Sequence, residues 1–90
     1  MKVRKHLVFY GRVQGVGFRY TLYHYAQQYG ITGWVRNRYD GCVEAILQGE
    51  DQLIQQIIQN MQTTRYIVIE RMEIENLDIL EHENSFEVRY

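Results

Sequence analysis

A glycine-rich segment, Gly11–Arg19, carries the residue types of an anion-binding site and joins an expected strand to an expected helix. Gly15 and Gly17 allow the backbone to curl so that successive N–H groups point inward, and the helix N-terminus adds partial positive charge. Arg19 falls in the first helical turn, where the helix dipole disfavours a cation. Because a planar guanidinium can hold two oxygens of one phosphate, an arginine here indicates a fixed anionic partner.

The same segment departs from two widespread phosphate motifs. A Walker loop ends in Gly-Lys followed by Ser or Thr, whereas this segment ends in Gly17-Phe18-Arg19. The dinucleotide fingerprint requires a third glycine at the position that Tyr20 occupies. The residues therefore leave an alternative open, in which the loop is only a connecting turn and Arg19 pairs with a surface carboxylate.

A second segment, Gly33–Glu44, places Asn37 near the expected end of a strand. Its neutral amide offers both a donor and an acceptor, so it could hold a water molecule in one orientation without competing with an anion for protons. An asparagine at this point can instead ease the chain into the following turn. Spacing alone does not separate the two roles.

Hydrophobic periodicity predicts the elements that position these residues. Alternation of apolar and polar residues predicts strands at Lys5–Arg12, Thr32–Arg38, Cys42–Gln48 and Tyr66–Glu75, and a short last strand that holds Phe86, Val88 and Tyr90. Helical spacing gives two apolar stripes, one with Phe18, Leu22, Tyr25, Ala26 and Tyr29, the other with Leu53, Ile54, Ile57, Ile58 and Met61.

Local signals mark the ends of these elements. Gly30 stands where a C-terminal glycine cap belongs, and Asp40-Gly41 is typical of a tight hairpin turn. The alternation slips between Ile69 and Met72, which predicts a bulge or a bend. Two helices on one face of a mostly antiparallel five-stranded sheet give a ferredoxin-like two-layer sandwich, an α+β fold with the order β-α-β-β-α-β and a short fifth strand. This fold hosts many unrelated activities, so the site must decide the function.

The composition is that of an ordinary folded protein. The 90 residues are 46% hydrophobic and 23% charged, which predicts a single domain over residues 1–90 and excludes disorder as the main state. Ten basic and eleven acidic residues leave a net charge of −1, which argues against general binding of nucleic acid or acidic membranes. No apolar run is long enough to span a bilayer or to act as a signal peptide, and Cys42 is the only cysteine. We therefore expect a soluble, reduced, cytoplasmic protein.

Other residues that could do chemistry have ordinary explanations. The three histidines, His6, His24 and His82, lack metal-ligand spacing, so we expect no metal site. Cys42 lacks a partner motif and is expected to be a small structural residue rather than a nucleophile. Asp40 is explained by the turn, and Glu44 alternates with core residues and should face water. A competing hypothesis is a binding module, which could bind a small ligand or single-stranded RNA, or could use the phosphate cradle to sense an anion without cleaving it. RNA binding on the sheet would need exposed aromatic residues on the central strands. Tyr10 is one candidate, but Glu44 and Ile46 offer no matching partner.

Two motifs in this chain resemble those of the acylphosphatase family. They are Gly11-Arg12-Val13-Gln14-Gly15-Val16 with Phe18-Arg19, and Gly33-Trp34-Val35 with Asn37 and Asp40-Gly41. The resemblance extends over nearly the whole chain, to Arg89-Tyr90. It implies a ferredoxin-like fold with the strand order 4-1-3-2-5.

The resemblance also implies an activity, namely hydrolysis of the carboxyl–phosphate bond of an acyl phosphate to a carboxylate and inorganic phosphate. Arg19 would clamp the phosphoryl group and Asn37 would orient the attacking water. Backbone N–H groups of the loop would complete the phosphate site; these belong to Gln14, Gly15, Val16, Gly17, Phe18 and Arg19. No metal or cofactor is implied, and we expect a monomer that binds neither nucleic acid nor membrane.

Two departures from the family pattern stand out. Gly17 occupies a position where vertebrate members carry cysteine, with little expected effect on the chemistry. The segment Gln62–Tyr66 lacks the Gly and Pro that are usual before the fourth strand, which leaves the shape of that loop open.

Overall fold

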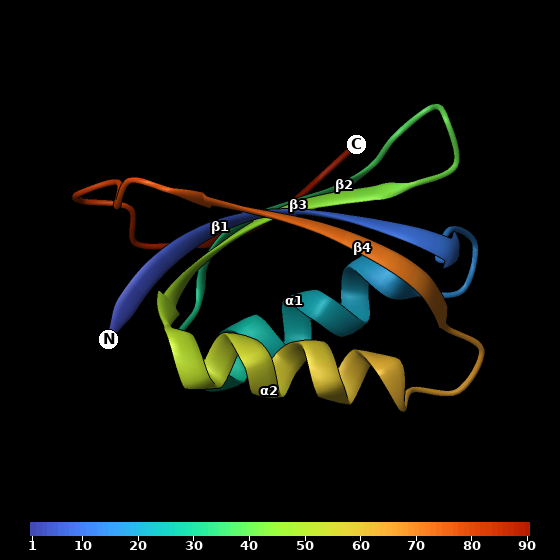
Figure 1. Cartoon of the computed structure of the whole chain (residues 1–90), viewed down its shortest axis with the longest axis horizontal. Helices are drawn as coiled ribbons and strands as arrows, with labels where there is room; N and C mark the ends of the chain where they lie inside the picture. The colour runs from blue at the N-terminus through green and yellow to red at the C-terminus, as the bar shows by residue number, and fades with distance from the viewer.

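The structure is a computed structural model that describes all residues from Met1 to Tyr90. It contains five strands and two helices in the predicted order (Figure 1). These are β1 (Lys2–Arg12), α1 (Phe18–Tyr29), β2 (Thr32–Asn37), β3 (Val43–Glu50), α2 (Asp51–Gln62), β4 (Val68–Leu77) and β5 (Phe86–Arg89). The main difference from the predicted bounds is that β1 begins at Lys2, because Lys2 and Val3 pair with the last two residues of β3.

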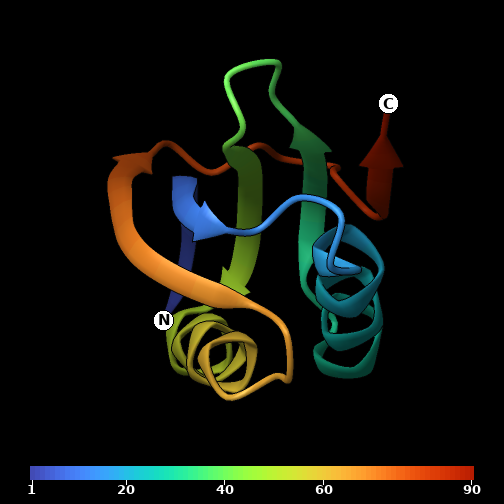
Figure 2. The ribbon, with the colours of Figure 1, turned by 90° about the vertical axis from the view of Figure 1, so that its right-hand side faces the viewer.

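The five strands form one sheet in the order β4-β1-β3-β2-β5. Neighbouring strands are antiparallel except β2 and β5, which run parallel. Both helices lie on the same face of the sheet, and β5 lies beside β2 at one edge (Figures 1 and 2). The predicted ferredoxin-like sandwich and the implied strand order are both confirmed.

The core fills the space between the sheet and the two helices. β1 contributes Leu7 and Phe9, and the ring of Phe9 packs against Phe18 of α1 at 4.9 Å between centroids. α2 contributes Ile54, Ile57 and Met61 from its predicted stripe, whereas Leu53 and Ile58 are only partly buried. Burying a Leu, Ile or Phe side chain contributes about 1.5–3 kcal/mol each, so this layer anchors the helices to the sheet.

Glycines fix both ends of α1. Gly17 is the N-cap and has φ of 80°, in the left-handed region that side chains with a Cβ rarely adopt. Gly30 is the C-cap with φ of 69°, and its N–H donates to the carbonyl of Ala26, as the sequence predicted. The first turn of α1 therefore begins abruptly after the glycine-rich loop.

The predicted bulge lies in β4. Tyr10 of β1 pairs with Arg71 but Gly11 pairs with Ile69, so Glu70 is the extra residue. The loop before β4 has no glycine, and Tyr66 adopts the positive φ of 75° that the turn requires. The hydroxyl groups of Thr63 and Thr64 both donate to the carbonyl of Asn60, which closes the end of α2.

Candidate active site

A cavity of about 170 Å³ opens between the glycine-rich loop, the start of α1 and the end of β2. It is lined by Val13, Gly15, Gly17, Phe18, Arg19, Tyr20 and Asn37. The two side chains that the sequence singled out, Arg19 and Asn37, therefore reach the same cavity from different elements. Its small size suits a group such as phosphate better than a large organic ligand.

The loop that leads into α1 offers unused hydrogen-bond donors. Gly15 and Gly17 have φ of 73° and 80°, and such left-handed residues let neighbouring N–H groups converge into an anion-binding concavity. None of the backbone N–H groups of Gln14–Gly17 donates to another backbone or side-chain group of the protein. The first N–H groups of α1 also lack partners within the helix, and the first helical bond of this turn runs from Thr21 N to Gly17 O at 3.0 Å. Donors from consecutive residues are thus available at one end of the cavity.

Arg19 makes no salt bridge, so the alternative in which it pairs with a surface carboxylate does not hold. Its Nη1 donates to the backbone carbonyl of Arg89 at 3.1 Å. Its guanidinium carbon lies 4.7 Å from the ring centroid of Tyr90. Both contacts are to uncharged groups, and the positive charge of Arg19 therefore has no neutralising partner within the protein.

Asn37 is the last residue of β2, and its side-chain amide makes no hydrogen bond within the protein. The hairpin turn is held by other groups. The Asp40 carboxylate accepts from the N–H of Cys42 at 3.2 Å, which lowers the pKa of Asp40, and Arg38 N donates to Cys42 O at 2.8 Å. Because the turn closes without its side chain, Asn37 leaves its amide free at the cavity.

Two members of the implied phosphate set do not line the cavity with their side chains. Gln14 Nε2 donates to the carbonyls of Arg38 and Cys42, at 2.6 and 2.9 Å, and so ties the glycine-rich loop to the β2–β3 hairpin. Val16 is half-buried against the core. Only the backbone N–H groups of Gln14 and Val16 are left to contribute to an anion site.

Two lining residues, and the contacts that Arg19 makes with Arg89 and Tyr90, were not predicted from the sequence. Val13 and Tyr20 line the cavity, and neither belongs to the predicted site. The hydrogen bond of Arg19 to Arg89 joins positions that are 70 residues apart in the chain, and no local pattern predicts it or the contact of Arg19 with Tyr90. Apart from Arg19 and Tyr20, the lining holds no titratable side chain. The arrangement can hold an anion and a water molecule, but it offers no carboxylate, imidazole or amine as a base.

Comparison with known proteins identifies the family. The family model described as Acylphosphatase matches residues 5–88, which is nearly the whole chain. The chain belongs to the acylphosphatase family. It is accordingly a hydrolase with the fold of that family.

Relatives of full length support this membership. The chain is 40% identical to an acylphosphatase from Geobacillus thermodenitrificans over 88 residues, which covers 97% of this chain and 94% of the relative. It also resembles the crystal structure of an acylphosphatase from Bacillus subtilis, with a TM-score of 0.89, 29% identity and coverage of 98% and 99%. An acylphosphatase structure from Coxiella burnetii matches with a TM-score of 0.86 and 28% identity over 98% of this chain and 93% of that one.

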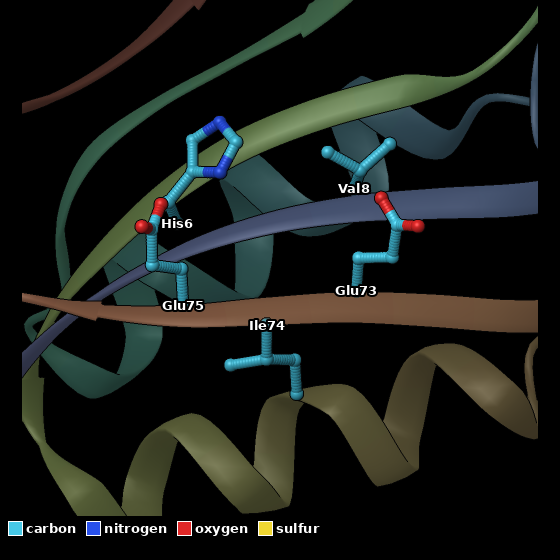
Figure 3. Close-up of a pocket in the computed structure, with 5 residues that line it drawn as sticks. All are labelled: His6, Val8, Glu73, Ile74 and Glu75. Atoms are coloured by element: carbon cyan, nitrogen blue, oxygen red, sulfur yellow. The ribbon is translucent and has the colours of Figure 1, made fainter.

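This acylphosphatase-family chain has a second, larger hollow of about 240 Å³ between β1 and β4. It is lined by His6, Val8, Glu73, Ile74 and Glu75. Figure 3 shows the two glutamates, His6 and Val8 pointing away from α2, whereas Ile74 points toward that helix. Two carboxylates would repel a phosphoryl group, so this hollow is a poor site for an anionic substrate.

Glu44 lies on the same outer face of the sheet, and the expectation that it faces water is wrong. Its carboxylate contacts His6 Nε2 at 2.6 Å and the guanidinium of Arg36 at 2.7 Å, and its side chain is 14% exposed. His6 and Arg36 belong to β1 and β2, the strands that flank β3, and their side chains cover the Glu44 carboxylate from both sides. Burial alone would raise the pKa of Glu44, but the hydrogen bonds from His6 and Arg36 outweigh it and lower the pKa.

The aromatic residues of the outer face are covered by arginines. Tyr10 donates to Glu73 at 2.8 Å and lies under the guanidinium of Arg71 at 4.0 Å. Trp34 has the guanidinium groups of Arg36 and Arg89 near its ring, at 6.0 and 4.7 Å from the centroid. A nucleotide base would have to displace these arginines before it could stack.

Two structural features concern membranes and metals. Neither helix is long and apolar enough to cross a bilayer. No group of three or more His, Cys, Asp or Glu side chains is close enough together to hold a metal ion.

Proposed function

We propose that this chain hydrolyses the carboxyl–phosphate bond of acyl phosphates, giving a carboxylate and inorganic phosphate. One observation carries the proposal beyond membership of the family. Arg19, with no counter-ion, and Asn37, with an unused amide, line a single phosphate-sized cavity beside the free N–H groups of Gln14–Gly17. A guanidinium, converging amides and a carboxamide are the groups that this reaction requires.

The phosphoryl group would be held by Arg19 and by the backbone N–H groups of the loop. As the bond from phosphorus to the acyl oxygen breaks, negative charge shifts within the phosphoryl group and onto the departing carboxylate. Donors fixed before the reaction stabilise this charge without reorganising, which is worth about 2.7–4 kcal/mol for a single well-placed donor. Arg19 supplies the only full positive charge among the lining residues.

Asn37 would orient the attacking water in line with the departing carboxylate. The water oxygen forms the new bond to phosphorus as the acyl oxygen leaves. The cavity lining contains no carboxylate, imidazole or amine to take the proton of the water, so a phosphate oxygen of the substrate is the acceptor in this scheme. An acyl phosphate already has a good leaving group, and positioning together with charge stabilisation can supply most of the rate.

The direct test is turnover of acetyl phosphate and benzoyl phosphate by the purified chain in the presence of a metal chelator. The expected result is release of carboxylate and phosphate in equal amounts, at the same rate with and without chelator. p-Nitrophenyl phosphate, whose leaving group is poorer, serves as the control and should react much more slowly. Phosphate binding without turnover of either acyl phosphate would show a binding module instead of an enzyme.

We also propose that residues 1–90 act as one domain and as a monomer. One chain by itself supplies Arg19, Asn37 and the loop N–H groups, so the cavity needs no second copy to complete it. Activity per chain should therefore stay constant on dilution, measured together with the molecular mass by light scattering.

A further inference from the structure

Two consecutive residues in the first turn of α1 contact the segment Arg89-Tyr90. Arg19 Nη1 donates to the carbonyl of Arg89 at 3.1 Å, and the Arg19 guanidinium lies over the ring of Tyr90 at 4.7 Å. The hydroxyl oxygens of Tyr20 and Tyr90 are 2.8 Å apart, which is a hydrogen bond. Tyr90 therefore makes a hydrogen bond with Tyr20 through its hydroxyl and contacts the Arg19 guanidinium through the face of its ring.

These contacts restrict Arg19 without using up its charge. A free arginine side chain loses rotamer entropy when an anion fixes it. The carbonyl of Arg89 accepts one hydrogen bond, from a single guanidinium nitrogen of Arg19. The contact with the face of the Tyr90 ring uses no N–H donor. A guanidinium has five N–H donors, so Arg19 keeps donors for an incoming phosphoryl group while much of its freedom is already lost.

The pair of tyrosines is not part of the core. Tyr20 is 59% exposed and Tyr90 is 88% exposed, so burial of their rings does not explain why they meet. The hydrogen bond with Tyr20 raises the pKa of Tyr90, as expected when the Tyr90 hydroxyl proton is held in that bond. Tyr20 also lines the cavity, which places this contact at the rim of the site.

We propose that Tyr20 and Tyr90 are positioning residues that hold the Arg19 guanidinium ready for the phosphoryl group, Tyr90 by ring contact and Tyr20 by fixing Tyr90. The inference rests on the proposed function, in which Arg19 binds the substrate phosphate. A group that only restricts Arg19 in advance helps the ground state and the transition state equally. Its loss should therefore raise KM and weaken phosphate binding while kcat stays nearly constant.

The test compares Tyr20→Phe, Tyr90→Phe and Tyr90→Ala with the wild type. Binding of inorganic phosphate is measured by calorimetry, and KM and kcat are measured with acetyl phosphate. An exposed cation–ring contact is worth about 0.5–1 kcal/mol, so Tyr90→Ala should weaken phosphate binding and raise KM by about two- to fivefold. Tyr20→Phe and Tyr90→Phe, which lose only the hydroxyl pair, should show a smaller effect of equal size.

A double variant separates the two roles. If Tyr20 acts through Tyr90, then Tyr20→Phe has no further effect in the Tyr90→Ala background. Tyr20→Phe should also lower the pKa of Tyr90 toward its ordinary value in an ultraviolet titration. Tyr39→Ala is the matched control, because Tyr39 is fully exposed at the hairpin tip, and it should leave phosphate binding unchanged.

Three outcomes would overturn the inference. Unchanged phosphate affinity and KM in Tyr90→Ala would show that the ring contact does not position Arg19. A lowered melting temperature that accounts for the loss of binding would show a structural role. A further loss on adding Tyr20→Phe to Tyr90→Ala would show that Tyr20 acts directly. A wild type that binds phosphate but leaves acyl phosphates intact would contradict the proposed function alone, since the binding series would still report on Arg19.

Discussion

The two hollows of this molecule differ in charge more than in size. The smaller one, beside Arg19 and Asn37, has an uncompensated guanidinium, free N–H groups and no carboxylate. The larger one, between β1 and β4, has two carboxylates, from Glu73 and Glu75. The lining of the larger hollow would therefore repel the anion that the smaller hollow can bind. The lesson is that unused donors and net charge locate this site, whereas the volume of a hollow alone would point to the wrong face of the sheet.

The largest expected effect comes from removing the charge at the smaller hollow. Arg19→Ala should lower kcat/KM for acetyl phosphate by at least about 10²–10³ and should weaken phosphate binding, because both clamp and charge are lost. Arg71→Ala is the matched control near the larger hollow, since Arg71 lies over Tyr10 and outside the cavity lining. Equal losses in the two variants would remove the distinction between the hollows.

Asn37→Ala should show that orientation of the water and binding of the phosphate depend on different groups of the same site. We expect kcat to fall by about 10², because a misplaced reactant costs about that much, while phosphate affinity stays close to that of the wild type. Asn76→Ala, on the edge strand β4, is the control and should keep full activity. Turnover by Asn37→Ala at the wild-type rate would show that its amide does not orient the water.

Gly17→Ala tests whether the loop shape matters in itself. Both Gly17 and Gly41 have positive φ and open space around the position of a Cβ, so each substitution to alanine should cost about 1–2 kcal/mol of stability through backbone strain. Only Gly17→Ala should also lower kcat/KM, by about tenfold, because it shifts the N–H groups beside the cavity. Chemical denaturation and steady-state kinetics on the two variants give both quantities.

The smallest effect on activity is expected on the outer face. Glu44→Gln should lower stability at pH 7 by on the order of 1 kcal/mol and leave kcat/KM unchanged, because Glu44 binds His6 and Arg36 on the outer face of the sheet, outside the cavity lining. Folding lowers the pKa of Glu44 from its ordinary value of 4.5, so its stabilisation is present above that value and is lost as pH falls through the folded value.

The difference in stability between wild type and Glu44→Gln should therefore be smaller at pH 3 than at pH 7, which urea titrations at both pH values can check. Glu75→Gln, at a carboxylate without a hydrogen-bond or salt-bridge partner in the protein, should change stability by less than about 0.5 kcal/mol at either pH. A difference between wild type and Glu44→Gln that is as large at pH 3 as at pH 7 would mean that the charge of Glu44 is not the source of its contribution.

The sequence predicted the fold well because its signals are local. Gly30 and Asp40-Gly41 mark an element end and a turn by their own conformational preferences, and both lie where they were predicted. The bulge near Glu70 was visible as a slip in alternation, since each residue of a strand shows its face through its neighbours.

The rest of the site depends on contacts between distant residues. Tyr90 meets Arg19 only because β5 adds to the edge of β2 in parallel, and nothing near Arg19 in the chain signals that pairing. Glu44 was misjudged because alternation tells which face a side chain is on, but not which neighbours cover that face. The side-chain hydrogen bonds of Gln14 were missed because they are made across the gap between the loop and the hairpin.

The parallel pairing of β5 with β2 has a consequence for synthesis on the ribosome. Arg19 is translated long before Arg89, whose carbonyl it contacts, and the two are 70 positions apart. A nascent chain whose β5 is still inside the exit tunnel cannot make that contact. The full phosphate affinity of the site should thus appear only after β5 has emerged and paired with β2.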